Sequence, residues 1–252
     1  MIHDQDTGGN CILSDMVAGL GQIAVGCTAI ISWCLASGVQ VGWFFVGAIL
    51  WGVSVGLKML CARMINKQVI GFLHTLLPYY AMVAIGGLYL GAHSSLFEMG
   101  LTLVGVLIWP SLGQGAGRAI AIGVGAGAIE AFLLGIYSLL IGIARHTGGF
   151  EWQIANDAST RLGWLLPPVE RTIAVLCHAS SRALILLGAA SGNYALIFWG
   201  FLLFTLLDGT AGAAHISGKL ETTSLWRVEL ALTPFALASI LILVWCWEKF
   251  NF

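Results

Sequence analysis

Charged residues are scarce in this sequence. Asp, Glu, Lys and Arg together make up 9 % of its 252 residues, whereas an ordinary soluble domain carries roughly 25 %. Apolar residues account for 58 % of the chain, and the mean hydropathy is +0.91. This composition excludes water as the main solvent and predicts an integral membrane protein whose immediate partner is the lipid bilayer.

Long basic runs and paired cysteines are absent as well. The densest basic group is Lys58, Arg63 and Lys67, and the formal net charge is −1. A nucleic-acid partner needs a run of cations that neutralise phosphates, so we exclude that class. The six cysteines occur singly, with no CxxC pair, and we interpret them as small buried residues rather than metal ligands. No metal or cofactor is predicted.

Apolar stretches of about 20 residues, the length that crosses a bilayer, follow one another along nearly the whole chain. We predict an all-α, polytopic transmembrane bundle of seven or eight helices that forms a single domain over residues 1–252. Residues 146–167 combine tryptophans with charged groups and are predicted to lie at the membrane interface. The predicted spans are 16–37, 41–63, 69–91, 96–112, 119–144, 168–190, 193–214 and 225–247.

Small residues recur every four positions in the predicted span 119–144, at Gly123, Gly127 and Ala131. This spacing lets two helix backbones approach closely in lipid, where no hydrophobic driving force pulls helices together. We therefore expect this face to pack against a neighbouring helix.

Four ionisable residues fall well inside predicted spans: Glu130, His178, Arg182 and Asp208. A charge in hydrocarbon costs at least ~2.5–3.5 kcal/mol, so each of them needs a partner, a water-filled cavity or a chemical role. Lys58 lies close to the end of its predicted span, and we expect its ammonium group to reach the interface.

The predicted span 168–190 carries a basic face. Arg171, His178 and Arg182 are separated by seven and four residues, which places them within roughly 20° of one line along a helix. Glu170 lies two turns from His178 and about 80° round the helix, and we expect it near the membrane surface.

The Arg182 guanidinium stays charged and therefore needs a carboxylate. The candidates at comparable depth are Glu130 and Asp208, and we predict that Arg182 forms a salt bridge with one of them. Such a pair can simply lock helices together. The alternative is a site in which a carboxylate activates water while the imidazole of His178 orients the water or stabilises an oxyanion.

Three segments resemble the motifs of the YhfC family, which groups with the CAAX prenyl-endopeptidase-like glutamic intramembrane proteases. They read GVGAGAIEAFLLG at 123–135, VERTIAVLCH at 169–178 and LFTLLDG at 203–209. The resemblance covers roughly residues 40–215, and its most specific motif is the Glu-Arg pair followed at seven residues by His. It implies a protease-like helix bundle in a bacterial cytoplasmic membrane.

The resemblance also implies roles for single residues. Glu130 matches the general base, His178 matches the histidine of the second motif, and Asp208 matches the acid of the third, so the resemblance implies that these three residues are catalytic. The third motif of the family usually has a histidine where this sequence has Phe204. Because of that departure, it stays open whether the protein is a degenerate, non-proteolytic member of the family.

Three functions therefore compete. The first is a metal-independent intramembrane endopeptidase that cleaves a membrane-embedded or lipid-proximal peptide with water activated by Glu130. The second is a non-catalytic scaffold subunit that holds partner proteins in a membrane complex, as Phe204 suggests. The third is a transporter or channel, for which intramembrane charges are also expected.

Overall fold

The computed structural model describes residues 6–146, 163–218 and 224–250, and this part of the chain is helical nearly throughout. Two short 3₁₀ helices, η1 (Pro110–Gly113) and η3 (Gly163–Leu165), precede α4 and α5. The long helices are α1 (Asp6–Ser37), α2 (Gly42–Leu76), α3 (Tyr79–Ile108), α4 (Ala116–His146), α5 (Leu166–Ser191), α6 (Tyr194–Ile216) and α7 (Trp226–Phe250).

Each of these seven long helices contains a stretch that is long and apolar enough to cross a membrane. Large apolar side chains point outward from the bundle; Leu35 is 81 % exposed and Ile108 is 79 % exposed. An apolar surface of this extent is suited to lipid rather than water. The prediction of an all-helical, multi-pass membrane bundle is confirmed, whereas most of the predicted interfacial segment 146–167 lies outside the described residues.

The segment 41–112 forms two long helices where we predicted three spans. The predicted break near residues 64–68 is helical, because α2 continues to Leu76. The chain breaks instead at Leu77, which is extended before Pro78. Proline disfavours the helical conformation of the residue before it, so the break follows directly from the sequence. The predicted spans 69–91 and 96–112 are therefore not separate helices.

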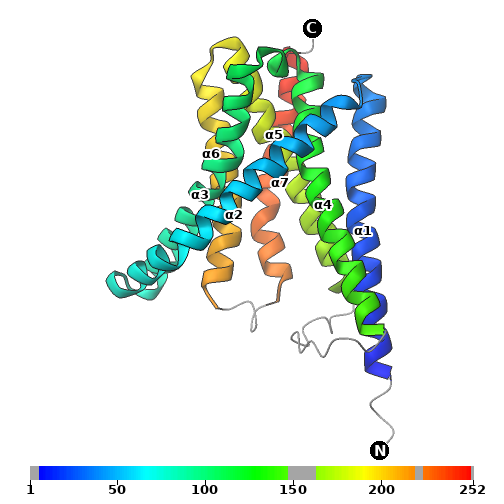
Figure 1. Cartoon of the computed structure of the whole chain (residues 1–252), viewed down its shortest axis with the longest axis vertical. Helices are drawn as coiled ribbons and strands as arrows, with labels where there is room; N and C mark the ends of the chain where they lie inside the picture. The colour runs from blue at the N-terminus through cyan, green and yellow to red at the C-terminus, as the bar shows by residue number, and fades with distance from the viewer. Residues whose placement is uncertain (1–5, 147–162, 219–223, 251–252) are drawn as a thin grey trace, which may run out of the picture.

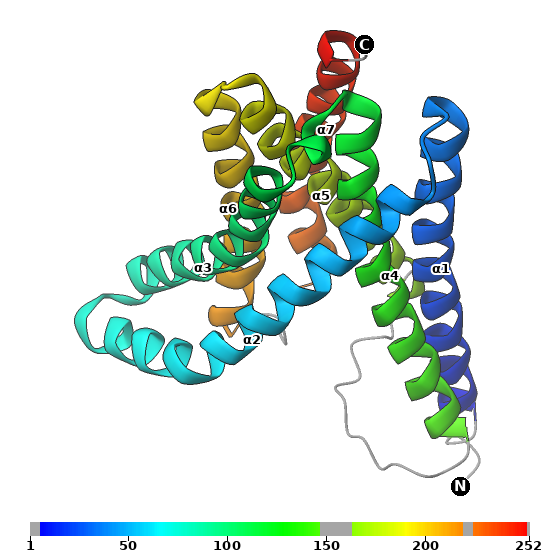
Figure 2. The same ribbon diagram turned by 45° about the horizontal axis from the view of Figure 1, so that its top comes forward.

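The helices pack in pairs around a central helix. α1 lies beside α4, and α3 lies beside α6, while α2 runs obliquely across the bundle (Figures 1 and 2). α5 packs against α1, α3, α4, α6 and α7, and its apolar stretch is the most deeply buried of the seven. This position makes α5 the helix around which a buried site can form.

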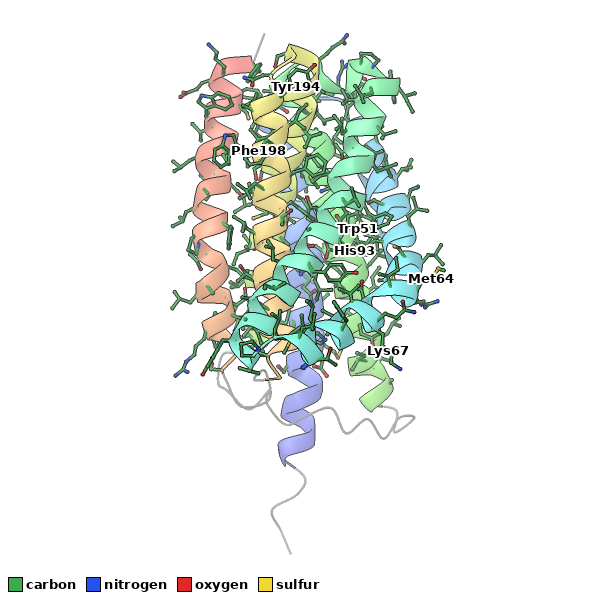
Figure 3. All side chains as sticks on the ribbon, turned by 90° about the vertical axis from the view of Figure 1, so that its left-hand side faces the viewer. Trp51, Met64, Lys67, His93, Tyr194 and Phe198 are labelled. Atoms are coloured by element: carbon green, nitrogen blue, oxygen red, sulfur yellow. The ribbon has the colours of Figure 1, made fainter. Side chains whose placement is uncertain are left out.

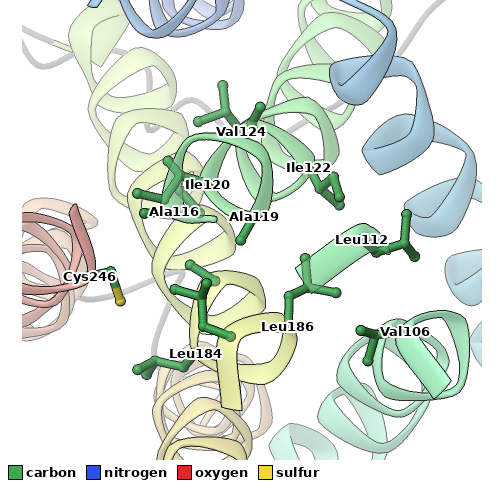
Figure 4. Packing of buried hydrophobic residues seen from close by; sticks show 14 of the residues in the cluster. Val106, Leu112, Ala116, Ala119, Ile120, Ile122, Val124, Leu184, Leu186 and Cys246 are labelled. Atoms are coloured by element: carbon green, nitrogen blue, oxygen red, sulfur yellow. The ribbon is translucent and has the colours of Figure 1, made fainter. Parts of the chain in front are cut away.

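The main apolar core lies between α4 and α5 (Figure 4). Alanines and isoleucines at the start of α4 pack against leucines near the end of α5, including Ile120 and Leu186. Phe44 of α2 and Cys246 of α7 close the sides of this core, and both are buried. The core fixes α4 and α5 relative to each other on one side of the polar site described below.

The predicted small-residue face of α4 packs directly on α5. A Cβ atom on Gly123 would lie 2.6 Å from Cα of Ala179, and one on Gly127 would lie 2.7 Å from Cα of Val175. Ala131, the next residue in the series, is fully buried. The two backbones are therefore close enough for Glu130 to reach the side chains of α5.

We expect Gly91→Ala to lower the free energy of unfolding by about 1–3 kcal/mol, because overpacking at a tight contact forces backbones apart. A Cβ atom there would collide with the carbonyl oxygen of Thr205 on α6 and lie 2.5 Å from the backbone nitrogen of Gly209. Unfolding in mixed micelles with increasing SDS would measure the loss. Gly100→Ala on the same helix is the matched control, since its Cβ would meet nothing within 4 Å. Equal losses in both variants would contradict this account.

Candidate functional site

Charged and polar side chains from five helices form one connected network in the middle of the bundle. Figure 3 shows His93, the neighbour of Ser94 on α3, between Lys67 toward one end and Tyr194 at the other. The members are Lys58 of α2, Ser94 and Glu98 of α3, Glu130 of α4, Glu170, Arg171, His178 and Arg182 of α5, and Asp208 of α6.

Glu130 links α4 to α5 through both of its carboxylate oxygens. Oε1 accepts a hydrogen bond from Nη1 of Arg171 at 2.7 Å, and Oε2 lies 2.8 Å from Nε2 of His178. The side chain of Glu130 is 24 % exposed, whereas that of His178 is 5 % exposed. Glu130 is thus the accessible carboxylate beside a buried imidazole.

The basic face of α5 points into this network, as the spacing of seven and four residues predicts. Arg171, His178 and Arg182 are all buried and all contact carboxylates or each other. α5 begins at Leu166 with prolines in its first turn, where a missing N–H costs least. Glu170 pairs with Arg171 at 2.6 Å and remains 43 % exposed.

Arg182 does not form the predicted salt bridge with Glu130 or Asp208. Its Nη2 pairs with Oε2 of Glu98 at 3.1 Å, and its Nη1 contacts Nδ1 of His178. The prediction was wrong because Glu98 fell at the start of the predicted span 96–112, close to an interface. In the continuous helix α3, Glu98 lies ten residues before Ile108, deep among the other helices and 2 % exposed.

Lys58 also lies elsewhere than we expected. Its Nζ donates to Oε1 of Glu98 at 2.6 Å and to Oγ of Ser94 at 3.0 Å, so the ammonium group points inward rather than to the interface. Because α2 extends to Leu76, Lys58 lies at the middle of the helix and not near its end. Lys58 and Glu98 are each a single charged residue within an apolar run, and this was the signal that the sequence analysis missed.

Asp208 lies at the α6 side of the network. Its Oδ2 accepts a short hydrogen bond from Oγ of Ser94, which also lies 3.3 Å from Oε1 of Glu98. Phe204, one turn earlier on α6, is buried with its ring centroid 5.0 Å from that of His178. Phe204 therefore covers the imidazole and does not extend the polar network.

The network balances its own charges. Besides the more exposed Glu170 and the imidazole, it contains equal numbers of cations and carboxylates, namely Lys58, Arg171 and Arg182 with Glu98, Glu130 and Asp208. Buried charges are tolerated only when they are paired and hydrogen-bonded in this way. Among the described residues, no group of three or more His, Cys, Asp or Glu side chains is arranged to hold a metal ion.

Glu130 has the geometry of a group that can bind water. A carboxylate offers about four lone-pair positions, and Arg171 and His178 occupy one on each oxygen. The remaining positions can accept a hydrogen bond from a water molecule, and the two donors hold the carboxylate in place.

Comparison with protein-family models, curated proteins and solved structures found no match to this chain.

Proposed function

We propose that the protein is a metal-independent intramembrane endopeptidase of the glutamic type. The observation that carries the proposal is the contact of 2.8 Å between Oε2 of Glu130 and Nε2 of His178, which joins a partly exposed carboxylate to a buried imidazole. The carboxylate is the general base and the imidazole its hydrogen-bonding partner. The motif resemblance at 123–135, 169–178 and 203–209 supports the same assignment.

The proposed reaction is hydrolysis of a peptide bond. Glu130 takes a proton from water, and the water oxygen forms a bond to the peptide carbonyl carbon, whose oxygen becomes negatively charged. The C–N bond then breaks, and the proton on Glu130 passes to the leaving amine. Arg171 and His178 hydrogen-bond the two oxygens of Glu130 and so hold the base in position for this proton transfer. Asp208 takes no direct part, because it contacts Ser94 at the far side of the network.

The substrate class follows from the depth of the site. Glu130 lies 14 residues after the start of α4, and His178 lies 12 residues after the start of α5. At 1.5 Å per residue, each is about 20 Å along its helix. A peptide that reaches them must enter the hydrocarbon region, so we propose a transmembrane or lipid-proximal segment of another protein as the substrate. The family resemblance makes the bacterial cytoplasmic membrane the proposed location.

A second candidate is a non-catalytic subunit of a membrane protein complex. Phe204 favours it, because this side chain replaces a histidine of the family motif and packs on His178. Both oxygens of Glu130 are also already paired, which is the arrangement of a buried lock between helices. In this case the exposed apolar helices would bind a partner subunit rather than a substrate.

Hydrolysis in ¹⁸O-labelled water tests the proposal. The protein in lipid nanodiscs would be incubated with a pooled library of hydrophobic transmembrane peptides, and the products analysed by mass spectrometry. We expect cleaved peptides with one ¹⁸O atom in each new carboxyl terminus. Absence of cleavage across the library, together with a stoichiometric membrane protein that copurifies with the chain, would instead support the non-catalytic subunit.

A further inference from the structure

We propose that Arg182, anchored by Glu98, is a positioning residue that fixes His178 as the neutral imidazole with its proton on Nε2. The catalytic consequence of this inference rests on the proposed function, but the protonation pattern itself does not. It makes His178 a hydrogen-bond donor toward Glu130 and leaves the carboxylate as the proton acceptor of the site.

Nδ1 of His178 contacts Nη1 of Arg182, and a guanidinium group can only donate hydrogen bonds. Nδ1 must therefore accept, which requires it to carry no proton. The nearest carboxylate oxygen on that side, Oε2 of Glu98, is 3.8 Å from Nδ1, too far to accept a hydrogen bond from it.

The other ring nitrogen has the opposite kind of partner. Nε2 of His178 lies 2.8 Å from Oε2 of Glu130, and an ionised carboxylate can only accept. The single proton of the neutral imidazole is therefore on Nε2. The partners on the two sides of the ring therefore favour the same tautomer.

The guanidinium is itself held in place. Arg182 is fully buried, and Glu98 binds it through Oε2 while Oε1 binds Lys58 at 2.6 Å. Phe204 covers the imidazole, with ring centroids 5.0 Å apart. A ring flip of His178 would therefore have to displace a buried phenyl group and bring the Nε2 proton against another donor. Glu98 and Arg182 together determine which way the imidazole presents its proton.

Nitrogen-15 NMR of the full chain in nanodiscs tests the inference directly. The protein would be labelled with ¹⁵N-histidine, and His178, one of six histidines, assigned by the signals that a His178→Gln variant loses. We expect a protonated-type shift at Nε2 and an unprotonated-type shift at Nδ1. A proton on Nδ1 in the wild-type protein would overturn the proposal, whatever the effect of any substitution.

Two substitutions at Arg182 separate positioning from simple structural support. Lysine can also only donate, so Arg182→Lys should keep the wild-type ¹⁵N pattern. The glutamine amide can accept as well as donate, so Arg182→Gln should give a mixture of the two tautomers. An unchanged pattern in Arg182→Gln would show that Arg182 does not position the ring.

The NMR result for His178 and the hydrolysis result for the proposed function can each fail without the other. A wild-type protein that has the proton on Nε2 but cleaves nothing would contradict the peptidase and leave the positioning by Arg182 intact. A protein that hydrolyses peptides with the proton on Nδ1 would do the reverse.

Discussion

Replacing Glu130 by Gln is expected to reduce peptide hydrolysis by about 10²–10⁴-fold, the contribution typical of a general base. The amide has nearly the same shape as the carboxylate but cannot take a proton from water. It also has only one oxygen, so it accepts from either Arg171 or His178 and not from both as the carboxylate does. The rate of ¹⁸O-labelled product formation in nanodiscs measures the effect.

Glu170→Gln provides the matched control for this variant. Glu170 pairs with the same arginine, at 2.6 Å, but its side chain is 43 % exposed. Loss of an exposed ion pair has a small effect in most proteins, so hydrolysis should be close to that of the wild type. Undiminished hydrolysis in Glu130→Gln, or an equal loss in Glu170→Gln, would remove Glu130 from the role of base.

Local spacing on a single helix predicted one half of the site well. The intervals between Arg171, His178 and Arg182 depend only on helical geometry, so their common face could be predicted without knowing any neighbouring helix. The glycines before Glu130 likewise indicated a close helix contact, which the structure shows to be with α5. The face that a residue occupies on its helix depends only on its spacing from residues a few positions away, so the sequence alone can predict it.

The other half of the site could not be predicted because it depends on where helices end. Predicted breaks at residues 64–68 and 92–95 put Lys58 and Glu98 near the ends of their spans, where a charged side chain needs no buried partner. Pro78 carried the correct signal, since the residue before a proline disfavours helix and Leu77 is indeed extended. Asn66, which falls inside the predicted break, lies within α2 and accepts a hydrogen bond from Tyr89.

The partner of Arg182 also depends on tertiary structure. Three carboxylates lie at similar depth in the bundle, and only the crossing of α3 over α5 decides that Glu98 is the one within reach. Sequence alone could require a carboxylate for this arginine but could not choose it. The packing of α6 on α5 likewise brings Phe204 against His178, a contact that the residue pattern on α6 does not reveal.

Glu98→Gln is expected to destabilise the fold by about 3–5 kcal/mol, the usual effect of removing one partner from a buried ion pair. The substitution would leave the guanidinium of Arg182, which is fully buried, without a carboxylate. Lys58 would lose its carboxylate too, but its side chain is 24 % exposed and can reorient toward a more polar region. Unfolding in SDS-containing mixed micelles would measure the change in free energy.

A double variant distinguishes an unpaired charge from a loss of packing. Glu98→Gln combined with Arg182→Gln removes both charges, so it should be more stable than Glu98→Gln alone. Together with the Arg182→Gln single variant and the wild type, it closes a double-mutant cycle that gives the coupling energy between the two residues. Glu170→Gln again serves as the exposed control, with an expected change of about 0–1 kcal/mol. If Glu98→Gln were no more destabilising than Glu170→Gln, or if the double variant showed no recovery, the buried pair would not be what holds α3 against α5.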